Sequence, residues 1–142
     1  MPYLQFDRDK LFVKSLSQRK DKVFIERDHV PVNASVAKPL SGLGQKTMNE
    51  LADRLILAKK TNKSRMLTFG AHAIKNGLAP VFIHLMKEGW VTHLATNGAG
   101  IIHDWEFAYQ GKSSEDVREN VNLGQFGIWD DTGFYINLSL VA

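Results

Sequence analysis

Two short apolar segments, residues 65–70 and 91–96, constrain the fold of this chain most strongly. Each has the length of a strand and runs into a turn of small residues that opens a helical pattern. A strand, a helix and a second strand within about 30 residues make a βαβ unit, whose strands pair in parallel through a right-handed crossover. The sequence therefore predicts an α/β fold with a parallel sheet, in which residues 65–70 form a buried strand.

Helices are expected around these strands. Residues 47–60 have helical periodicity, and Thr47 with Glu50 three positions later fits a capping box at the start. Gly77 and Pro80 interrupt the next helical stretch, so we expect a short turn to Gly77 and a new helix from near Ala79. The positions expected to form the apolar stripes of these two helices are Met48, Leu51, Leu55 and Ala58, and Val81, Phe82, Leu85 and Met86.

Shorter elements complete the expected order. Residues 23–25 are an apolar run consistent with a strand, and residues 101–109 follow the Gly100 turn as a helix. Ser113 with Asp116 is expected to cap a helical turn over residues 116–120. Residues 130–133 are expected to form a turn before the apolar segment 134–142.

The chain divides into an irregular N-terminal extension, residues 1–45, and a segment of α/β pattern, residues 46–142. An apolar periodic element begins near residue 134 without a cap, and two parallel strands alone do not complete a doubly wound sheet. We therefore expect a truncated chain, the N-terminal part of a longer protein. A small complete domain that adds its last element to an oligomer is the alternative.

The composition excludes several classes of protein. The chain has no cysteine, no apolar run near the roughly 20 residues that cross a bilayer, and no apolar signal core at its charged N-terminus. We therefore expect a cytoplasmic protein without a membrane partner. The net charge is +3, but the basic clusters at residues 14–22 and 59–65 contain no interleaved aromatic side chains, so no nucleic-acid partner is expected.

The turn at residues 96–100 is the strongest candidate for a ligand site. At the carboxyl end of a parallel strand, Gly98 and Gly100 let the backbone approach a ligand, and the free N–H groups of the next helix point at an anion. The dinucleotide pattern G-x-G-x-x-G is incomplete because His103 occupies its last glycine position. Residues 69–72 end the neighbouring strand similarly, and Lys75 is placed to add positive charge. The alternative is that these glycines only permit a tight turn.

His103 and Asp104 are the candidate chemical groups, and we place them in the first turn of the helix that follows Gly100. A histidine near the positive end of a helix tends to stay neutral and to act as a proton acceptor. The alternative is a polar side chain on a helix surface. His72, His93, His103 and Asp104 fall at no recognised metal-ligand spacing, so no metal is expected.

From about residue 67 to residue 127 the sequence resembles the deoxyhypusine synthase family. Residues 68–77, TFGAHAIKNG, stand where the family has a serine- and asparagine-containing turn that ends in glycine. Residues 91–100 follow at the family spacing, as an apolar strand that ends in a glycine turn. Ile102 and His103 stand where the family has two glutamates, and residues 118–120 are similar to a further family segment.

The resemblance implies a Rossmann-like NAD-binding fold, of which residues 46–142 are the N-terminal part, and a homotetramer. It implies a transferase that uses NAD to oxidise spermidine and passes an aminobutyl group to an acceptor amine through a lysine beyond Ala142. His103 stands at a position implied to face the amine substrate. The positions expected to contact NAD, including both glycines of the turn, are Ala71, His72, Lys75, Asn97, Gly98, Ala99 and Gly100.

Three functions stay open from the sequence. The first is an NAD-dependent, deoxyhypusine-synthase-like transferase acting on an amine. The second is a non-catalytic nucleotide-binding or assembly module of the same fold. The third is a different enzyme on this scaffold, in which His103 is a general base for a substrate other than a polyamine.

Overall fold

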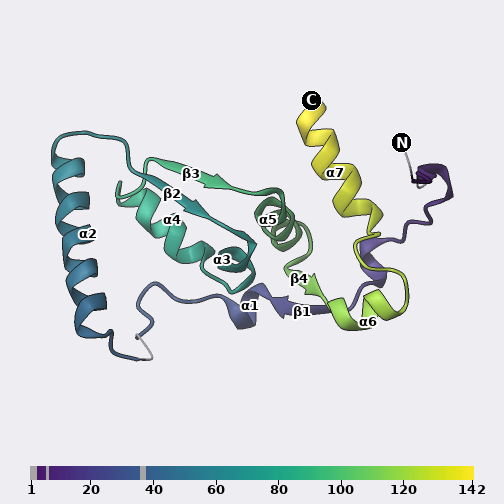
Figure 1. The fold of residues 1–142 in the computed structure, drawn as a ribbon, viewed down its shortest axis with the longest axis horizontal. Helices are drawn as coiled ribbons and strands as arrows, with labels where there is room; N and C mark the ends of the chain where they lie inside the picture. Colours follow the sequence, from purple (N-terminus) through teal and green to yellow (C-terminus); the bar gives the residue numbers. More distant parts are fainter. Residues whose placement is uncertain (1–2, 6, 36–37) are drawn as a thin grey trace.

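The computed structural model describes residues 3–5, 7–35 and 38–142 (Figure 1). Strands β2 and β3 lie with helices α3, α4 and α5 in the middle of the molecule, while α2 stands at one end and α7 near the other. The elements in chain order are η1 (Arg8–Lys10), η2 (Leu16–Gln18), β1 (Asp21–Phe24), α1 (Ile25–Asp28), α2 (Gly42–Lys60), β2 (Met66–Phe69), α3 (Ala71–Lys75), α4 (Ala79–Lys87), β3 (His93–Thr96), α5 (Gly98–Gln110), β4 (Lys112–Glu115), α6 (Val117–Asn122) and α7 (Asp130–Val141).

Strands β2 and β3 pair in parallel, in a register that runs from Met66 opposite His93 to Phe69 opposite Thr96. Helices α3 and α4 form the connection between them, so the predicted βαβ unit and the α/β class are confirmed. Among the described residues this sheet has only these two strands, and β1 and β4 form a separate antiparallel sheet.

The prediction that residues 65–70 form a buried strand is wrong in its burial. Leu67 and Phe69 are half-buried, whereas Met66 and Thr68 are exposed, so β2 alternates between its two faces. Phe69 lies on the covered face, where its ring packs against Phe82 of α4 with centroids 4.8 Å apart. Because successive side chains of a strand point to opposite faces, covering one face leaves every second residue in solvent.

The break between α3 and α4 follows the prediction. α4 begins at Ala79 and has Pro80 in its first turn, where a proline is tolerated. Gly77 precedes it with φ +83°, and a side chain there would collide with the carbonyl oxygen of Asp28. The left-handed backbone and the close approach both require glycine at this position.

Helix α2 starts earlier than predicted. It begins at Gly42, because the Ser41 side chain accepts a hydrogen bond from the Gly44 amide and caps the helix there. The predicted capping box is therefore wrong. Thr47 lies inside the helix, and its hydroxyl donates to the Leu43 carbonyl.

The apolar stripes of α2 and α4 are more exposed than their patterns predict. Met48 and Leu51 of α2 are 49% and 48% exposed, and Met86 of α4 is 40% exposed. α2 extends away from the other elements (Figure 1), and the Lys59 ammonium near its C-terminal end lies 4.1 Å from the centre of the Trp90 ring. The amphipathic pattern identified the helix, but the described elements leave much of this face in solvent.

Residues 112–115 form strand β4, which the sequence analysis missed. β4 pairs with β1 in antiparallel fashion, with Asp21 opposite Glu115. The prediction that Ser113 caps the next helix is wrong, because Ser113 lies in the strand. The Asp116 side chain caps α6 instead, by accepting a hydrogen bond from the Glu119 amide.

The core lies around α5, and its buried apolar side chains are Leu16, Ile74, Phe107 and Trp129. Residues 8–28 were expected to be irregular apart from a strand at residues 23–25, but they contain η1, η2, β1 and α1 and contribute Leu16 to this core. The expected strand is present as β1, although it starts at Asp21 and ends at Phe24. Residues 130–133, predicted as a turn, form the first turn of α7. The domain boundary at residue 45 stays a prediction.

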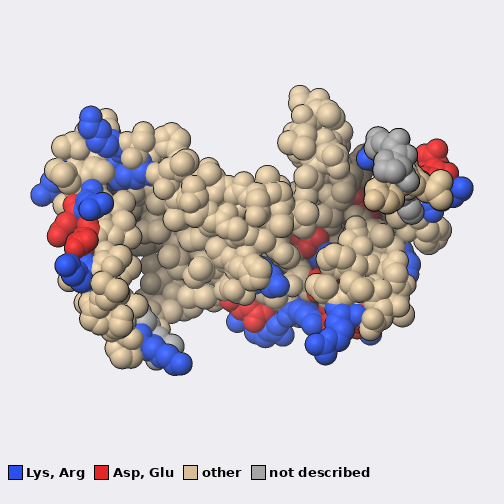
Figure 2. Space-filling model, in the orientation of Figure 1, with Lys and Arg blue, Asp and Glu red and all other residues tan. Residues whose placement is uncertain are grey.

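Charged side chains are unevenly distributed over the surface. In the view of Figure 2 they gather over α2 and along the edge near β1, α1 and α6, whereas the face over β2 and β3 shows few. Among the helices of the described ranges, none has both the length and the apolar character needed to span a bilayer.

Candidate functional site

Helix α5 presents four side chains to one cavity of about 400 Å³. Ala99, Ile102, His103 and Glu106 occupy positions i, i+3, i+4 and i+7, which place them on one face of the helix. The other walls come from β4, from the segment that leads into α7, and from α7 itself. Lys75 of α3 also lines the cavity, because α3 packs against α5.

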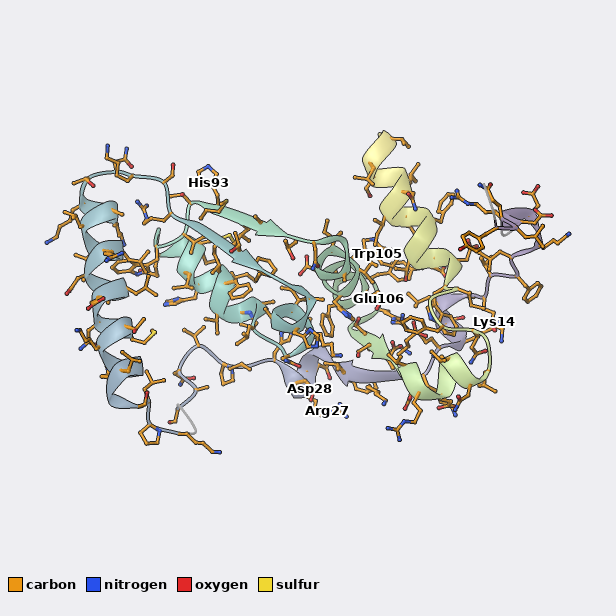
Figure 3. The ribbon with its side chains drawn as sticks, viewed as in Figure 1. Lys14, Arg27, Asp28, His93, Trp105 and Glu106 are labelled. Atoms are coloured by element: carbon orange, nitrogen blue, oxygen red, sulfur yellow. The ribbon has the colours of Figure 1, made fainter. Side chains whose placement is uncertain are left out.

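Glu106 is the centre of a buried hydrogen-bond network. Arg19 donates to both of its carboxylate oxygens, from Nη1 to Oε1 at 2.8 Å and from Nη2 to Oε2 at 2.6 Å. Thr132 Oγ1 donates to Oε1 at 2.9 Å, and Ser113 Oγ donates to Oε2 at 2.5 Å. Asp21 holds Arg19 from another side, with its Oδ1 2.8 Å from Nε. Figure 3 shows Glu106 on the side of α5 that faces β4 and α7.

This network holds Glu106 as a carboxylate. Burial opposes its ionisation, but hydrogen bonds from Arg19 and Ser113 and the charge of Arg19 outweigh burial and keep the pKa of Glu106 below its ordinary value. Each carboxylate oxygen already accepts two hydrogen bonds. Glu106 is therefore a structural anion, with no acceptor position left for a substrate cation.

His103 is a neutral group at the wall of the cavity. Its Nδ1 lies 2.7 Å from Ser113 Oγ. Burial lowers the pKa of His103 below its ordinary value; the charge of Glu106 opposes this effect, and the positive charge of Lys75 adds to it. The predicted place of His103 in the first helical turn is wrong, because α5 begins at Gly98. Burial, rather than the helix end, keeps the ring neutral.

A second acid, Glu115, lines the same cavity. Its Oε2 accepts a hydrogen bond from Asn120 Nδ2 at 2.6 Å, and its Oε1 accepts one from the Gly127 amide at 3.1 Å. Among the described residues no lysine or arginine forms a salt bridge with it. Glu115 therefore has its negative charge uncompensated by a cationic partner, which suits it to bind a cation.

The strand-end turn is partly as predicted. Within the described residues, the amides of Gly98 and Ala99 have no hydrogen-bond acceptor, as expected for the first turn of a helix. The Gly100 amide is not free, because it donates to Asn97 Oδ1 at 2.9 Å and to the Asn97 carbonyl at 2.9 Å. The prediction that Gly100 offers a free amide to a ligand is therefore wrong.

Gly100 has a packing role instead. A side chain at this position would collide with Thr96 Oγ1 and lie 3.2 Å from Thr96 Cβ, so α5 can approach β3 only with glycine there. At Gly98 an added Cβ would meet nothing within 4 Å. Of the two glycines, Gly98 is thus the one with open space for a ligand.

The remaining predicted residues lie in different parts of the structure. Residues 68–70 and 95–97 line an open groove across the neighbouring strand ends, where Asn97 caps α5 at Gly98 and where Ala71 and His72 begin α3. Asp104 lies away from His103, in a recess that Phe69 and Phe82 also line. Figure 3 places His93 at the far end of β3 from Glu106. The structure thus brings Lys75, Ala99 and His103 to one cavity and leaves Asp104 and His93 outside it.

Sequence reasoning missed Arg19, Glu106, Ser113, Thr132 and Glu115. A local signal existed only for Glu106, which follows His103 by three positions and so shares its helix face. The partners of Glu106 come from the N-terminal segment, β4 and α7. No local pattern marks such a convergence.

No family model matches this chain, and no curated protein or solved structure is significantly similar to it. The resemblance to deoxyhypusine synthases stays an interpretation of the sequence.

The assignment of Gly100 to packing and Gly98 to open space can be tested by two matched substitutions. Gly100→Ala should lower the free energy of unfolding by about 1–3 kcal/mol, as overpacking does, although alanine favours a helix. Gly98→Ala, in the same helical turn, should leave stability unchanged or slightly raised. Urea unfolding of both variants measures the difference, and equal midpoints would show that Thr96 yields to the added methyl group.

Proposed function

We propose that this chain is part of an NAD-dependent transferase of the deoxyhypusine synthase type, which has a Rossmann-like fold and acts on an amine. The strand ends at residues 68–70 and 95–99 would form one side of the NAD site, which we call the cofactor edge, and the cavity beside α5 would bind the substrate. The proposal rests chiefly on one observation: a neutral histidine, His103, and an acid with no cationic partner among the described residues, Glu115, line the same cavity. That cavity includes Ala99, which also belongs to the strand-end turn.

The strand ends offer groups that suit an anionic dinucleotide. The amides of Gly98 and Ala99 lack acceptors among the described residues, and Gly98 leaves space for close approach of a phosphate. The face over β2 and β3 shows few charged side chains in Figure 2, so backbone amides would be the main donors there. Lys75 would add a positive charge from α3. These features support NAD contacts at Lys75, Asn97, Gly98 and Ala99.

The cavity suits an alkyl amine. Glu115 attracts an ammonium group. In the family that the sequence resembles, a glutamate at the position of His103 is implied to have this role. Phe126, Trp129 and Ile136 give the cavity apolar walls for an alkyl chain, and aromatic faces also attract cations. Lys75 repels a second ammonium group in the cavity. We therefore expect a substrate whose cationic end lies at Glu115 and whose reacting nitrogen, near His103, is uncharged.

His103 would make the reacting nitrogen neutral. NAD, when bound, supplies the hydride acceptor for the carbon next to that nitrogen. The nitrogen must first lose its ammonium proton, because only a free lone pair can stabilise the carbon that loses hydride. His103 is neutral near pH 7 and accepts this proton at the ring nitrogen that is not bonded to Ser113.

The proposed NAD contacts at the start of α5 can be tested by placing a negative charge there. Gly98→Glu should abolish NAD binding, because its carboxylate occupies the anion position, yet it should not harm the helix, whose N-terminus favours an acid. Gly42→Glu is the matched control, since Gly42 also begins a helix and also has nothing within 4 Å of an added Cβ. Calorimetric titration with NAD measures the affinity of both variants. A wild-type protein that binds no NAD at millimolar concentration would end the cofactor proposal.

A further inference from the structure

Ser113 is the only hydroxyl that shares a hydrogen bond with His103 among the described residues, and its side chain is inaccessible to solvent, with 0% exposure. A residue so buried cannot act as a nucleophile toward a substrate. We infer that Ser113 is a positioning residue: it fixes the ring proton of His103 on Nδ1 and leaves Nε2 as the proton-accepting atom. The catalytic consequence of this inference rests on the proposed function, whereas the position of the proton does not.

The hydrogen bonds of Glu106 determine where the hydroxyl proton of Ser113 and the ring proton of His103 lie. An ionised carboxylate only accepts hydrogen bonds, so the single hydroxyl proton of Ser113 is committed to Glu106 Oε2, 2.5 Å away. Toward His103, Ser113 Oγ can then only accept, and the 2.7 Å contact requires a proton on Nδ1. A neutral imidazole has one ring proton, so Nε2 carries a lone pair.

The other charged groups around His103 do not provide an alternative acceptor for Nδ1. Lys75 on α3 and Arg19 before β1 act on the ring as positive charges, and His72 at the start of α3 also lowers the pKa of His103. Glu106 is the anion with the largest effect on the ring, and its oxygens are filled by Arg19, Thr132 and Ser113. Ser113 thus relays the effect of the carboxylate to the ring.

The backbone of β4 explains how Ser113 reaches α5. Ser113 and Ser114 are both buried, at 0% and 8% exposure, although successive residues of a regular strand point to opposite faces. Ser114 adopts φ +70°, in the left-handed region that residues other than glycine rarely occupy. This departure breaks the alternation and lets both side chains turn inward. Such a cost in backbone strain is typical of functional sites.

The nitrogen-15 spectrum of the histidine rings tests the inference, because protonated and unprotonated ring nitrogens resonate at well-separated shifts. The His103 signals are assigned by their loss in His103→Asn. In the wild-type protein at neutral pH, Nδ1 should have the shift of a protonated nitrogen and Nε2 that of an unprotonated one. In Ser113→Ala the two shifts should exchange, because Nδ1 has lost its acceptor and free imidazole prefers the proton on Nε2.

Two further variants keep the test decisive. Ser114→Ala removes the neighbouring buried hydroxyl, which has no hydrogen bond to His103, and should leave the shifts unchanged. Glu106→Gln should exchange them as Ser113→Ala does, because an amide can donate to Ser113 and free its proton for Nδ1. A wild-type ring protonated on Nε2, or unchanged shifts in both Ser113→Ala and Glu106→Gln, would overturn the inference. The measurement uses neither NAD nor an amine, so its result does not depend on whether the proposed function is correct.

Discussion

Replacing Glu106 by alanine is expected to lower the free energy of unfolding by about 3 kcal/mol, the lower end of the range for removal of one partner from a buried ion pair. The substitution leaves the guanidinium of Arg19 buried, at 6% exposure, without its bidentate acceptor. Asp21 remains beside Arg19 and limits the loss. Ser113 and Thr132 also lose their common acceptor. A small domain has about 5–15 kcal/mol of stability in total, so urea unfolding should show a large shift of the midpoint.

An exposed ion pair provides the control for this prediction. Lys20 and Glu119 lie 3.4 Å apart with side chains 85% and 47% exposed, and Glu119→Ala should cost only a small fraction of the Glu106 effect. Lowering the pH should also remove the stabilising contribution of Glu106. The pKa of Glu106 lies below its ordinary value of 4.5, so its contribution is complete above that pH and is lost as pH falls through the lowered value. Equal losses in the two variants would contradict a buried, charged Glu106.

Local signals in the sequence predicted the elements at the strand ends well. The strand-turn-helix passages at residues 65–72 and 91–100, the break at Gly77 and the start of α4 at Pro80 each depend on a few neighbouring residues. Where two local signals competed, the prediction failed. Thr47 with Glu50 fits a capping box, but Ser41 caps α2 six residues earlier, before two glycines that do not suggest a helix.

Long-range contacts account for most of the rest. β4 has the sequence KSSE, which lacks the apolar alternation of a strand, and it is held by pairing with β1 some 90 residues earlier in the chain. Arg19 and Glu106 are 87 residues apart. The periodicity of α2 predicted a helix with an apolar stripe, but it contains no information on whether another element covers that stripe.

The neutral state expected of His103 has a different physical cause from the one that the sequence suggested. The sequence suggested a neutral histidine because it placed the ring near a helix N-terminus. The structure places the ring one turn further along α5, where burial lowers its pKa. Local sequence was enough to place His103 in a helix, whereas its turn within that helix was predicted wrongly, and the environment that sets its protonation state comes from β4, α3 and the N-terminal segment.

Replacing His103 by asparagine is expected to lower the kcat of amine-dependent NADH formation by about 10²- to 10⁴-fold, the usual contribution of a general base. The asparagine side-chain amide can still donate to Ser113 Oγ as Nδ1 does, so the network around Glu106 is preserved while the basic Nε2 is lost. NAD affinity should stay within about twofold, because the strand-end amides are untouched. His84→Asn, on the exposed side of α4, is the control for the substitution itself.

The pH dependence separates loss of a base from loss of structure. His103 must be neutral to accept a proton, and its pKa is held below the ordinary 6.5, so activity of the wild-type protein should fall only as pH drops through that lowered value. The residual activity of His103→Asn should lack this acid limb, because no group with that pKa remains at the site. A variant that keeps full activity with an unchanged limb would remove His103 from the reaction. If such a variant retained NAD binding while Gly98→Glu abolished it, the chain would be a nucleotide-binding module whose buried histidine serves only the fold.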